Sequence, residues 1–262
     1  SCLPILELAD IEVAEQTTPF RTEVGTNSKT FWFTQPTNGI TYLNLQFDIS
    51  GLDNELRPYL PIFCTLLPQI GAAGHDYLAM ARRITAATGG IRLGTNLLES
   101  PLDIDSMRPV MEIKGKSLDH KQAAFCEILT DMLTAPDFTD INRLRTVIGQ
   151  VRTSMENSIP GSGHAFAARA AAASLTPTAA LREELSGMTQ VQTIQHASSL
   201  DDPGMIELAE AFKAITAELL VASRVTAAVT AEETAQKSMA APLAALLAAL
   251  PKQAKPTLHQ PA

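Results

Sequence analysis

The residues that most readily hold a catalytic metal ion are widely separated in this sequence. A zinc peptidase helix needs two histidines one turn apart and a nearby glutamate, because both imidazoles must face one metal ion. The chain has five histidines, and no two of them are closer than 32 residues: His75, His120, His164, His196 and His259. The sequence therefore predicts no zinc site and no zinc-dependent peptidase activity in this chain alone.

Two pairs of adjacent carboxylates are the next candidates for acid–base chemistry. They are Glu183-Glu184 and Glu232-Glu233, and both lie in stretches that we expect to be helical. Carboxylates are among the side chains most often left in water. We therefore interpret both pairs as solvated helix faces rather than as acid/base dyads.

The segment 158–165, SIPGSGHA, gathers glycine, serine and histidine before an alanine-rich run. Two glycines before a helix can present backbone N–H groups to an anion, but this segment lacks the lysine of a phosphate loop and the spacing of a dinucleotide turn. Ser162 and His164 resemble a nucleophile and a base. Residues two apart at a helix start point away from each other, however, and no third partner is evident.

We favour a structural role for this segment, as a tight corner between two helices. Gly161 and Gly163 then allow the two backbones to approach closely, and Ser162 is the N-cap of the second helix. Arg169, about two turns beyond the corner, is either a surface cation or a contact for an acidic partner. We therefore expect Gly161, Ser162, Gly163, His164 and Arg169 to have structural rather than catalytic roles.

The three cysteines, Cys2, Cys64 and Cys126, are too few and too scattered for a disulfide framework or a paired-cysteine metal site. Cys64 and Cys126 lie among phenylalanine, isoleucine and leucine. We interpret them as buried, reduced thiols. A reduced, cytosol-like compartment fits this usage.

The overall composition narrows the choice of partners. The chain has 262 residues, of which 45% are hydrophobic and 18% charged, and its net charge is −8. This composition excludes a disordered or fibrous chain. No cluster of lysine and arginine stands out along the sequence, so we expect neither nucleic acid nor a membrane as a partner. No apolar run is long enough for a membrane span, and the first residues lack the features of a signal peptide.

Several stretches have the composition and alternation of β-strands. The clearest is 40–49, where Leu43, Leu45 and Phe47 fall on one face, and Asn38-Gly39 before it predicts a hairpin with the preceding strand. Because the connections are short, we expect one antiparallel sheet. Its predicted strands are 30–35, 40–49, 90–98, 107–115 and 224–230.

Helical periodicity dominates the rest of the chain. We expect helices within 54–88, where Pro68 ends or kinks the first, and within 118–221. The class is therefore α+β, with helices covering one face of the sheet. The strand at 224–230 completes the sheet, so residues 28–235 form a single domain.

The two ends of the chain lie outside this predicted domain. Residues 1–27 read as a connector arm that can include an edge strand. Residues 236–262 read as an apolar helix and a linker toward a further domain. We expect the leucine stripe of that helix to be exposed and to cause self-association, through Leu243, Leu246, Leu247 and Leu250.

Five motifs occur in the order typical of one known family. They are LPILELADI at 3–11, TNGITYLNL at 37–45, LPIFC at 60–64, TGGI at 88–91 and IPGSGH at 159–164. Together they resemble the start of the second half of presequence proteases. These enzymes are the presequence-degrading branch of the pitrilysin/insulin-degrading zinc metallopeptidases, and the similarity extends over about residues 3–250.

The resemblance implies a specific place in a larger enzyme. Such peptidases have four related α+β domains in two halves that close around a peptide, and the first domain carries the zinc. This chain resembles the third, non-catalytic domain. The resemblance implies no catalytic or metal residue here, zinc in the missing N-terminal half, and a location in a bacterial-type cytoplasm or an organelle matrix.

The expected function is therefore to form part of a peptide chamber in an oligopeptide-degrading zinc metalloendopeptidase. The implied partners are the N-terminal catalytic half, the fourth domain and unstructured peptides. Gly161, Ser162, Gly163, His164 and Arg169 are then structural or chamber residues. A free-standing binding or scaffold protein that reuses the fold without catalysis is the alternative, and a truncated piece without an autonomous function is a third.

Overall fold

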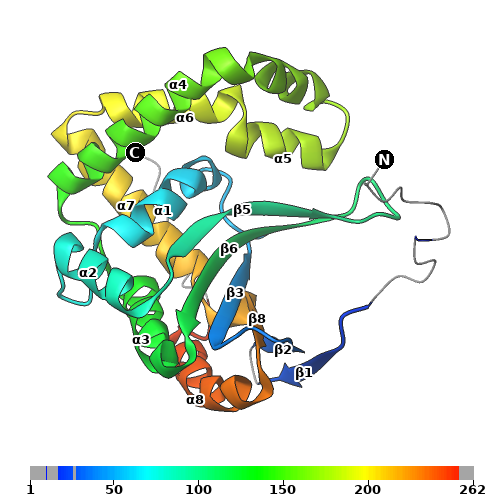
Figure 1. Ribbon diagram of the computed structural model, residues 1–262. Coiled ribbons are helices and arrows are strands. Elements are labelled where there is room, and N and C mark those ends of the chain that lie inside the picture. The colour runs from blue at the N-terminus through cyan, green and yellow to red at the C-terminus, as the bar shows by residue number, and fades with distance from the viewer. Residues whose placement is uncertain (1–9, 11–16, 26–27, 254–262) are drawn as a thin grey trace, which may run out of the picture.

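Six strands form the central sheet of the protein, in the order β1-β2-β8-β3-β6-β5 (Figure 1). The computed structural model describes residues 10, 17–25 and 28–253. The strands of the sheet are β1 (Phe20–Val24), β2 (Lys29–Thr34), β3 (Ile40–Asp48), β5 (Ile91–Glu99), β6 (Met107–Leu118) and β8 (Val225–Ala231). All five predicted strands are confirmed, and β1 is an edge strand within the expected connector arm. A separate two-stranded sheet pairs β4 (Gly71–Ala72) with β7 (Pro136–Asp137).

The predicted hairpin at Asn38-Gly39 is wrong, because β2 and β3 are not neighbours. Strand β8 lies between them, parallel to β2 and antiparallel to β3. The sheet is therefore mostly, not wholly, antiparallel. Asn38 and Gly39 still make the tight turn, with φ of 53° and 78°. The chain crosses the end of β8 there, and the backbone N–H of Asn38 donates to Glu232 just beyond that strand.

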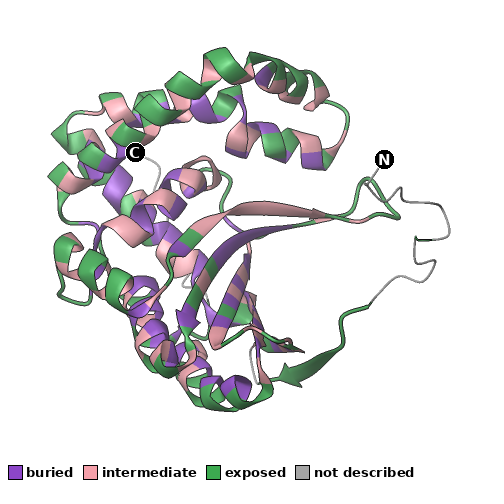
Figure 2. Ribbon diagram, in the orientation of Figure 1, coloured by how far each residue is buried: buried purple, intermediate pink, exposed green. Residues whose placement is uncertain are grey.

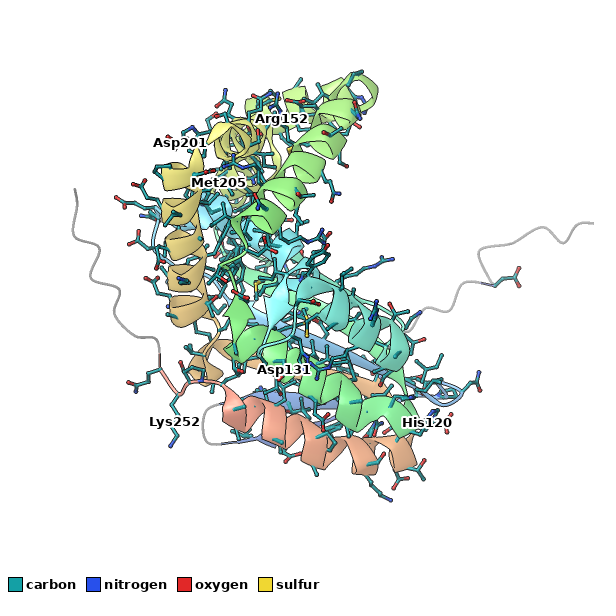
Figure 3. The ribbon with its side chains drawn as sticks, turned by 90° about the vertical axis from the view of Figure 1, so that its left-hand side faces the viewer. His120, Asp131, Arg152, Asp201, Met205 and Lys252 are labelled. Carbon is teal, nitrogen blue, oxygen red and sulfur yellow. The ribbon has the colours of Figure 1, made fainter. Side chains whose placement is uncertain are left out.

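Eight α-helices are described, and they belong to two groups. The first group is α1 (Leu60–Leu66), α4 (Ile141–Ala172), α5 (Pro177–Ser186), α6 (Met188–Ser199) and α7 (Asp202–Leu219). The second is α2 (Tyr77–Ala87), α3 (Gln122–Thr134) and α8 (Glu233–Ala249). Figure 3 shows α3 and α8 side by side across the sheet, with α4 and α7 at the other end. None of the helices in the described ranges is long and apolar enough to cross a membrane.

Local sequence signals set the helix starts, although some predicted caps are displaced by a residue or two. Asp140, Thr176 and Asp201 accept N-cap hydrogen bonds, where the sequence suggested Thr139, Thr178 and Asp202. As predicted, Pro68 follows the end of α1 and lies in a 3₁₀ turn that the chain makes instead of another helical turn.

The helices cover one face of the sheet, as the sequence predicts. In β3, Leu43, Leu45 and Phe47 are fully or almost fully buried, whereas their alternating neighbours are partly or largely exposed. Helix α3 packs so closely that a Cβ on Gly115 of β6 would lie 2.6 Å from the ring of Phe125. Only glycine fits there. The core therefore lies between the sheet and the helices.

The expectation of an exposed leucine stripe on the last helix is wrong. Leu243, Leu246 and Leu250 are at most 3% exposed and belong to the same core cluster as β3 and β8. Helix α8 packs on α3, β2 and β8, and its outward surface carries alanines instead. The stripe stabilises this domain rather than offering a surface for self-association. Residues 254–262, predicted as a linker, lie outside the described residues.

Candidate functional site

The five residues singled out around the SIPGSGHA segment lie on the long helix α4, away from the sheet (Figure 1). Ser162 has φ −127° and ψ 17°, so the helix kinks at the predicted position. The predicted close approach of two helices is wrong, because a Cβ on Gly161 or Gly163 would meet nothing within 4 Å. His164 is exposed. A structural or chamber role for these residues remains a prediction.

Arg169 is held by the end of a neighbouring helix. Its Nη1 donates to the carbonyl oxygen of Ser186 at 2.9 Å, at the end of α5, and its guanidinium lies 5.7 Å from the ring centre of Phe166. A cation at a helix C-terminus is favoured by the helix dipole. The contact explains how the second half of α4 is tied to α5.

The interpretation of Glu183-Glu184 as a solvated face is wrong. Glu184 makes an ion pair with Arg57 on the segment before α1. Glu183 is 9% exposed, and its Oε1 accepts a hydrogen bond from the backbone N–H of Thr189 in α6. Both carboxylates join neighbouring segments. Glu233, in contrast, is exposed and pairs with Lys237 one turn further along α8.

The cysteines behave as the sequence predicts for the part of the chain that the structure describes. Cys64 and Cys126 are free and buried, and burial raises the pKa of each thiol to about 12. Cys2 lies outside the described residues. No group of three or more histidine, cysteine, aspartate or glutamate side chains within the described ranges is arranged to hold a metal ion.

The face of the sheet away from the helices is the largest surface with grouped functional side chains. The pairing registers place on it the alternating residues of β3 that start at Tyr42, together with their cross-strand partners. We call this surface the open face. Its aromatic residues lie toward the β1 edge: Phe20, Phe31, Phe33 and Tyr42. Its cations are all exposed: Lys29 of β2, Arg92 of β5, and Arg108, Lys114 and Lys116 of β6.

A polar network crosses the open face between β3 and β6. Arg108 donates to Gln46 at 2.7 Å, Gln46 donates to Glu112 at 3.0 Å, and Lys114 lies 2.6 Å from the other oxygen of Glu112. Burial raises the pKa of Glu112, but Lys114 and the amides of Gln46 and Asn96 outweigh it, so the pKa is lower than usual. Glu112 is therefore anionic near neutral pH.

A polar pocket of about 410 Å³ borders this network. Arg224, directly before β8, lines the pocket, and its Nη1 and Nη2 donate to the carbonyl oxygens of Asp48 and Gly51 at 3.2 and 3.0 Å. Arg108 lines the same pocket. The fixed guanidinium of Arg224 uses two of its five N–H donors in these bonds, so others remain for a ligand.

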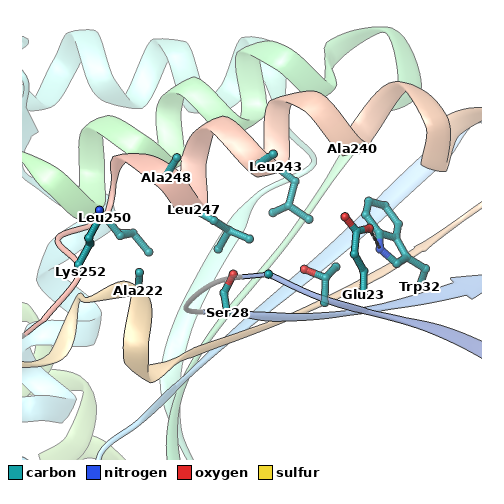
Figure 4. A pocket seen from close by; sticks show the side chains of 13 residues that line it. Glu23, Ser28, Trp32, Ala222, Ala240, Leu243, Leu247, Ala248, Leu250 and Lys252 are labelled. Atoms are coloured by element: carbon teal, nitrogen blue, oxygen red, sulfur yellow. Dashed lines mark hydrogen bonds between the residues drawn. The ribbon is translucent and has the colours of Figure 1, made fainter.

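A second pocket, of about 360 Å³, lies on the helix side between α8 and the β1–β2 hairpin (Figure 4). Trp32 closes one end, and its Nε1 donates to Glu23 at 3.1 Å. The alanines of α8 line one wall, and β1 is exposed along its whole length (Figure 2). The described residues that line this pocket include no charged cluster comparable with that of the open face, so the open face is the better candidate site.

Known proteins with similar sequences are presequence proteases. A family described as associated with peptidase M16, subfamily C, matches residues 1–196. The mitochondrial presequence proteases of Xenopus laevis and Danio rerio are 31% and 32% identical over 206 and 202 residues. These matches cover 79% and 77% of this chain, and the chain spans about a fifth of each relative, 20% in both cases.

A solved structure shares the fold. It is described as the peptidase M16 inactive domain from Pseudomonas fluorescens, with a TM-score of 0.55 and 21% identity. The match covers 93% of this chain and 54% of that one. The fold, the ordered motifs and the match over residues 1–196 agree, and the chain belongs to the family associated with peptidase M16, subfamily C.

Proposed function

We propose that this chain is a non-catalytic domain that forms part of the wall of a peptide chamber in an oligopeptide-degrading zinc metalloendopeptidase. The observation that carries the proposal is the open face of the sheet. A sheet with one solvated face usually presents polar side chains there. This face also presents aromatic side chains, with Phe20 57% and Tyr42 42% exposed, which suits contact with peptides.

The proposal gives the chemistry to another part of the whole protein. The histidines of this chain are far apart in sequence, and no candidate metal group is found among the described residues. The zinc ion would therefore be held by the N-terminal catalytic half, where it would activate the water that attacks the peptide bond. This chain would contribute the enclosing surface, together with the fourth domain.

The compartment belongs to the same proposal. The names of the frog and zebrafish relatives include the word mitochondrial, which supports an organelle matrix, while a bacterial-type cytoplasm fits the same sequence features. Both compartments keep Cys64 and Cys126 reduced, in agreement with their burial as free thiols.

Complementation with a purified catalytic half tests the proposal. The zinc-bearing half is mixed with this chain and the fourth domain, and cleavage of a long unstructured peptide is followed. We expect the rate to rise toward that of the intact enzyme only when this chain is present and folded. The control is the Ala227→Asp variant, which places a charge at a position with 0% exposure and should prevent folding.

Two results would contradict the proposal. If the catalytic half alone reaches the full rate, the chain is not needed to form the chamber. If metal analysis of the purified chain finds one tightly held zinc ion per molecule, the chain has a metal site and is not simply an enclosing domain. A chain that neither stimulates cleavage nor associates with the catalytic half would instead support the free-standing binding protein.

A further inference from the structure

The open face is strongly basic in a chain that is acidic overall. The net charge of the chain is −8, yet the six strands place five cations and only two carboxylates, Asp48 and Glu112, on this face. All six strands lie in the described part of the chain. A surface with the opposite sign to the rest of a protein attracts ligands of the complementary charge and repels others.

Most of these cations have no carboxylate to neutralise them. Lys114 is paired with Glu112. The ion pairs found among the described residues do not include Arg92, Arg108 or Lys116, all of which are exposed. Their positive charge is therefore available to a ligand that lies across β6 and β5.

The aromatic part of the face indicates which kind of anion fits. Phe20 lies 5.6 Å from Phe31 and 5.5 Å from Phe33, measured between ring centres. These rings pack on one another as a continuous apolar surface rather than as separate platforms for single bases. Such a surface suits apolar side chains next to carboxylates. We therefore favour a peptide over a single-stranded nucleic acid, which needs individual rings for base stacking.

We propose that the open face binds extended peptide segments that carry carboxylates, and thus gives the chamber a preference for acidic substrates. Apolar side chains of the peptide would contact the phenylalanines, and carboxylates would lie against Arg92, Lys114 and Lys116. The pocket between Arg108 and Arg224 would receive one further carboxylate. This inference rests on the proposed function, because it assigns a substrate class to the same surface.

The dimensions agree with a short peptide. Six strands spaced about 4.8 Å apart give a face roughly 24 Å wide, which about seven residues of extended chain can cross. The probe is therefore a fluorescently labelled, unstructured peptide of about ten residues, rich in glutamate and leucine. Its partner peptide has glutamine in place of every glutamate, so the two differ in charge but hardly in shape.

Fluorescence anisotropy with the purified chain measures the affinity for both peptides. We expect tighter binding of the glutamate peptide, and a loss of that advantage as the salt concentration rises. The double variant Arg92→Gln/Lys116→Gln should weaken binding of the glutamate peptide about fivefold, because each removed cation is exposed. Arg82→Gln is the matched control, since Arg82 is an exposed arginine of α2 on the helix side, outside the ion pairs found among the described residues.

Three results would overturn the inference. Equal affinity for the two peptides would remove the role of charge. An equal loss from Arg82→Gln would show that total charge, not the open face, matters. Tighter binding of a single-stranded oligonucleotide of the same charge would replace the peptide by a nucleic acid. Complementation of cleavage with neutral peptides can succeed whether or not charge-dependent binding is found, so the inference and the proposed function fail independently.

Discussion

The guanidinium of Arg57 contacts both carboxylate oxygens of Glu184, with Nε donating to Oε1 at 2.8 Å and Nη2 donating to Oε2 at 2.9 Å. The two residues are 127 positions apart, and their side chains are 28% and 22% exposed. The contact joins α5 to the segment before α1. The bond to Glu184 is also the main reason why the pKa of Arg57 is raised.

Breaking this two-point contact should destabilise the fold. We expect Glu184→Gln to lower the free energy of unfolding by about 1–2 kcal/mol, because a partly buried guanidinium loses its charged partner. Chemical denaturation measures the change. Glu210→Gln is the control, because Glu210 pairs with Lys213 at a more exposed position and should have almost no effect. Equal effects of the two substitutions would contradict the prediction.

The first half of the chain should not fold by itself. Residues 1–115 contain β2 and β3, but these strands pair only through β8, which comes more than a hundred residues after β6. We expect a fragment of residues 1–115 to show no cooperative thermal transition by circular dichroism. A cooperative melt of this fragment would mean that the sheet does not need β8.

Helix α8 should be essential to stability because its leucines are in the core. Leu246→Ala should reduce the free energy of unfolding by about 2–4 kcal/mol through loss of packing and creation of a cavity. Ala245→Ser, on the exposed side of the same helix, should leave it nearly unchanged. Similar losses in both variants would argue against the burial of this stripe.

The buried thiols should be unreactive in the folded protein. Burial raises the pKa of Cys64 and Cys126 to about 12, and the thiolate is the reactive form. In a Cys2→Ser background, we expect a thiol reagent at mildly alkaline pH to modify neither cysteine in native protein and both after denaturation. Rapid labelling of the native protein would show that one of these thiols is accessible.

Acid should weaken the polar network of the open face. Because the pKa of Glu112 is lower than usual, its contribution to stability is complete above pH 4.5, the ordinary value, and is lost as the pH falls through the lower value in the folded protein. Stability of the wild type should therefore decrease more steeply below pH 4.5 than that of Glu112→Gln. Parallel pH profiles for the two proteins would exclude a role for this carboxylate.

The sequence by itself determined the elements and much of the identity of this chain. Period-two alternation in 40–49 and helical periodicity around Pro68 predicted the local structure, because the side chains that are buried recur at the period of the element. The wide spacing of the histidines and the five ordered motifs indicated a non-catalytic member of a peptidase family. Each of these signals is carried by residues close together in the chain.

Only the tertiary structure decided how distant segments meet. A strand that follows a hundred helical residues entered between β2 and β3, and this replaced the hairpin that Asn38-Gly39 alone predicts. The carboxylate of Glu184 became a partner of Arg57, and the leucine stripe of α8 became core. Such outcomes depend on which surfaces remain unpaired after the whole chain is packed, which local patterns do not record.

The cations of the open face illustrate the same limit. Lys29, Arg92, Arg108, Lys114 and Lys116 are spread over almost ninety residues, and along the sequence they form no cluster that stands out. Alternation places each of them on one side of its own strand, but the side that three strands share is set by their register. A basic surface on an acidic protein is therefore a property of the folded sheet.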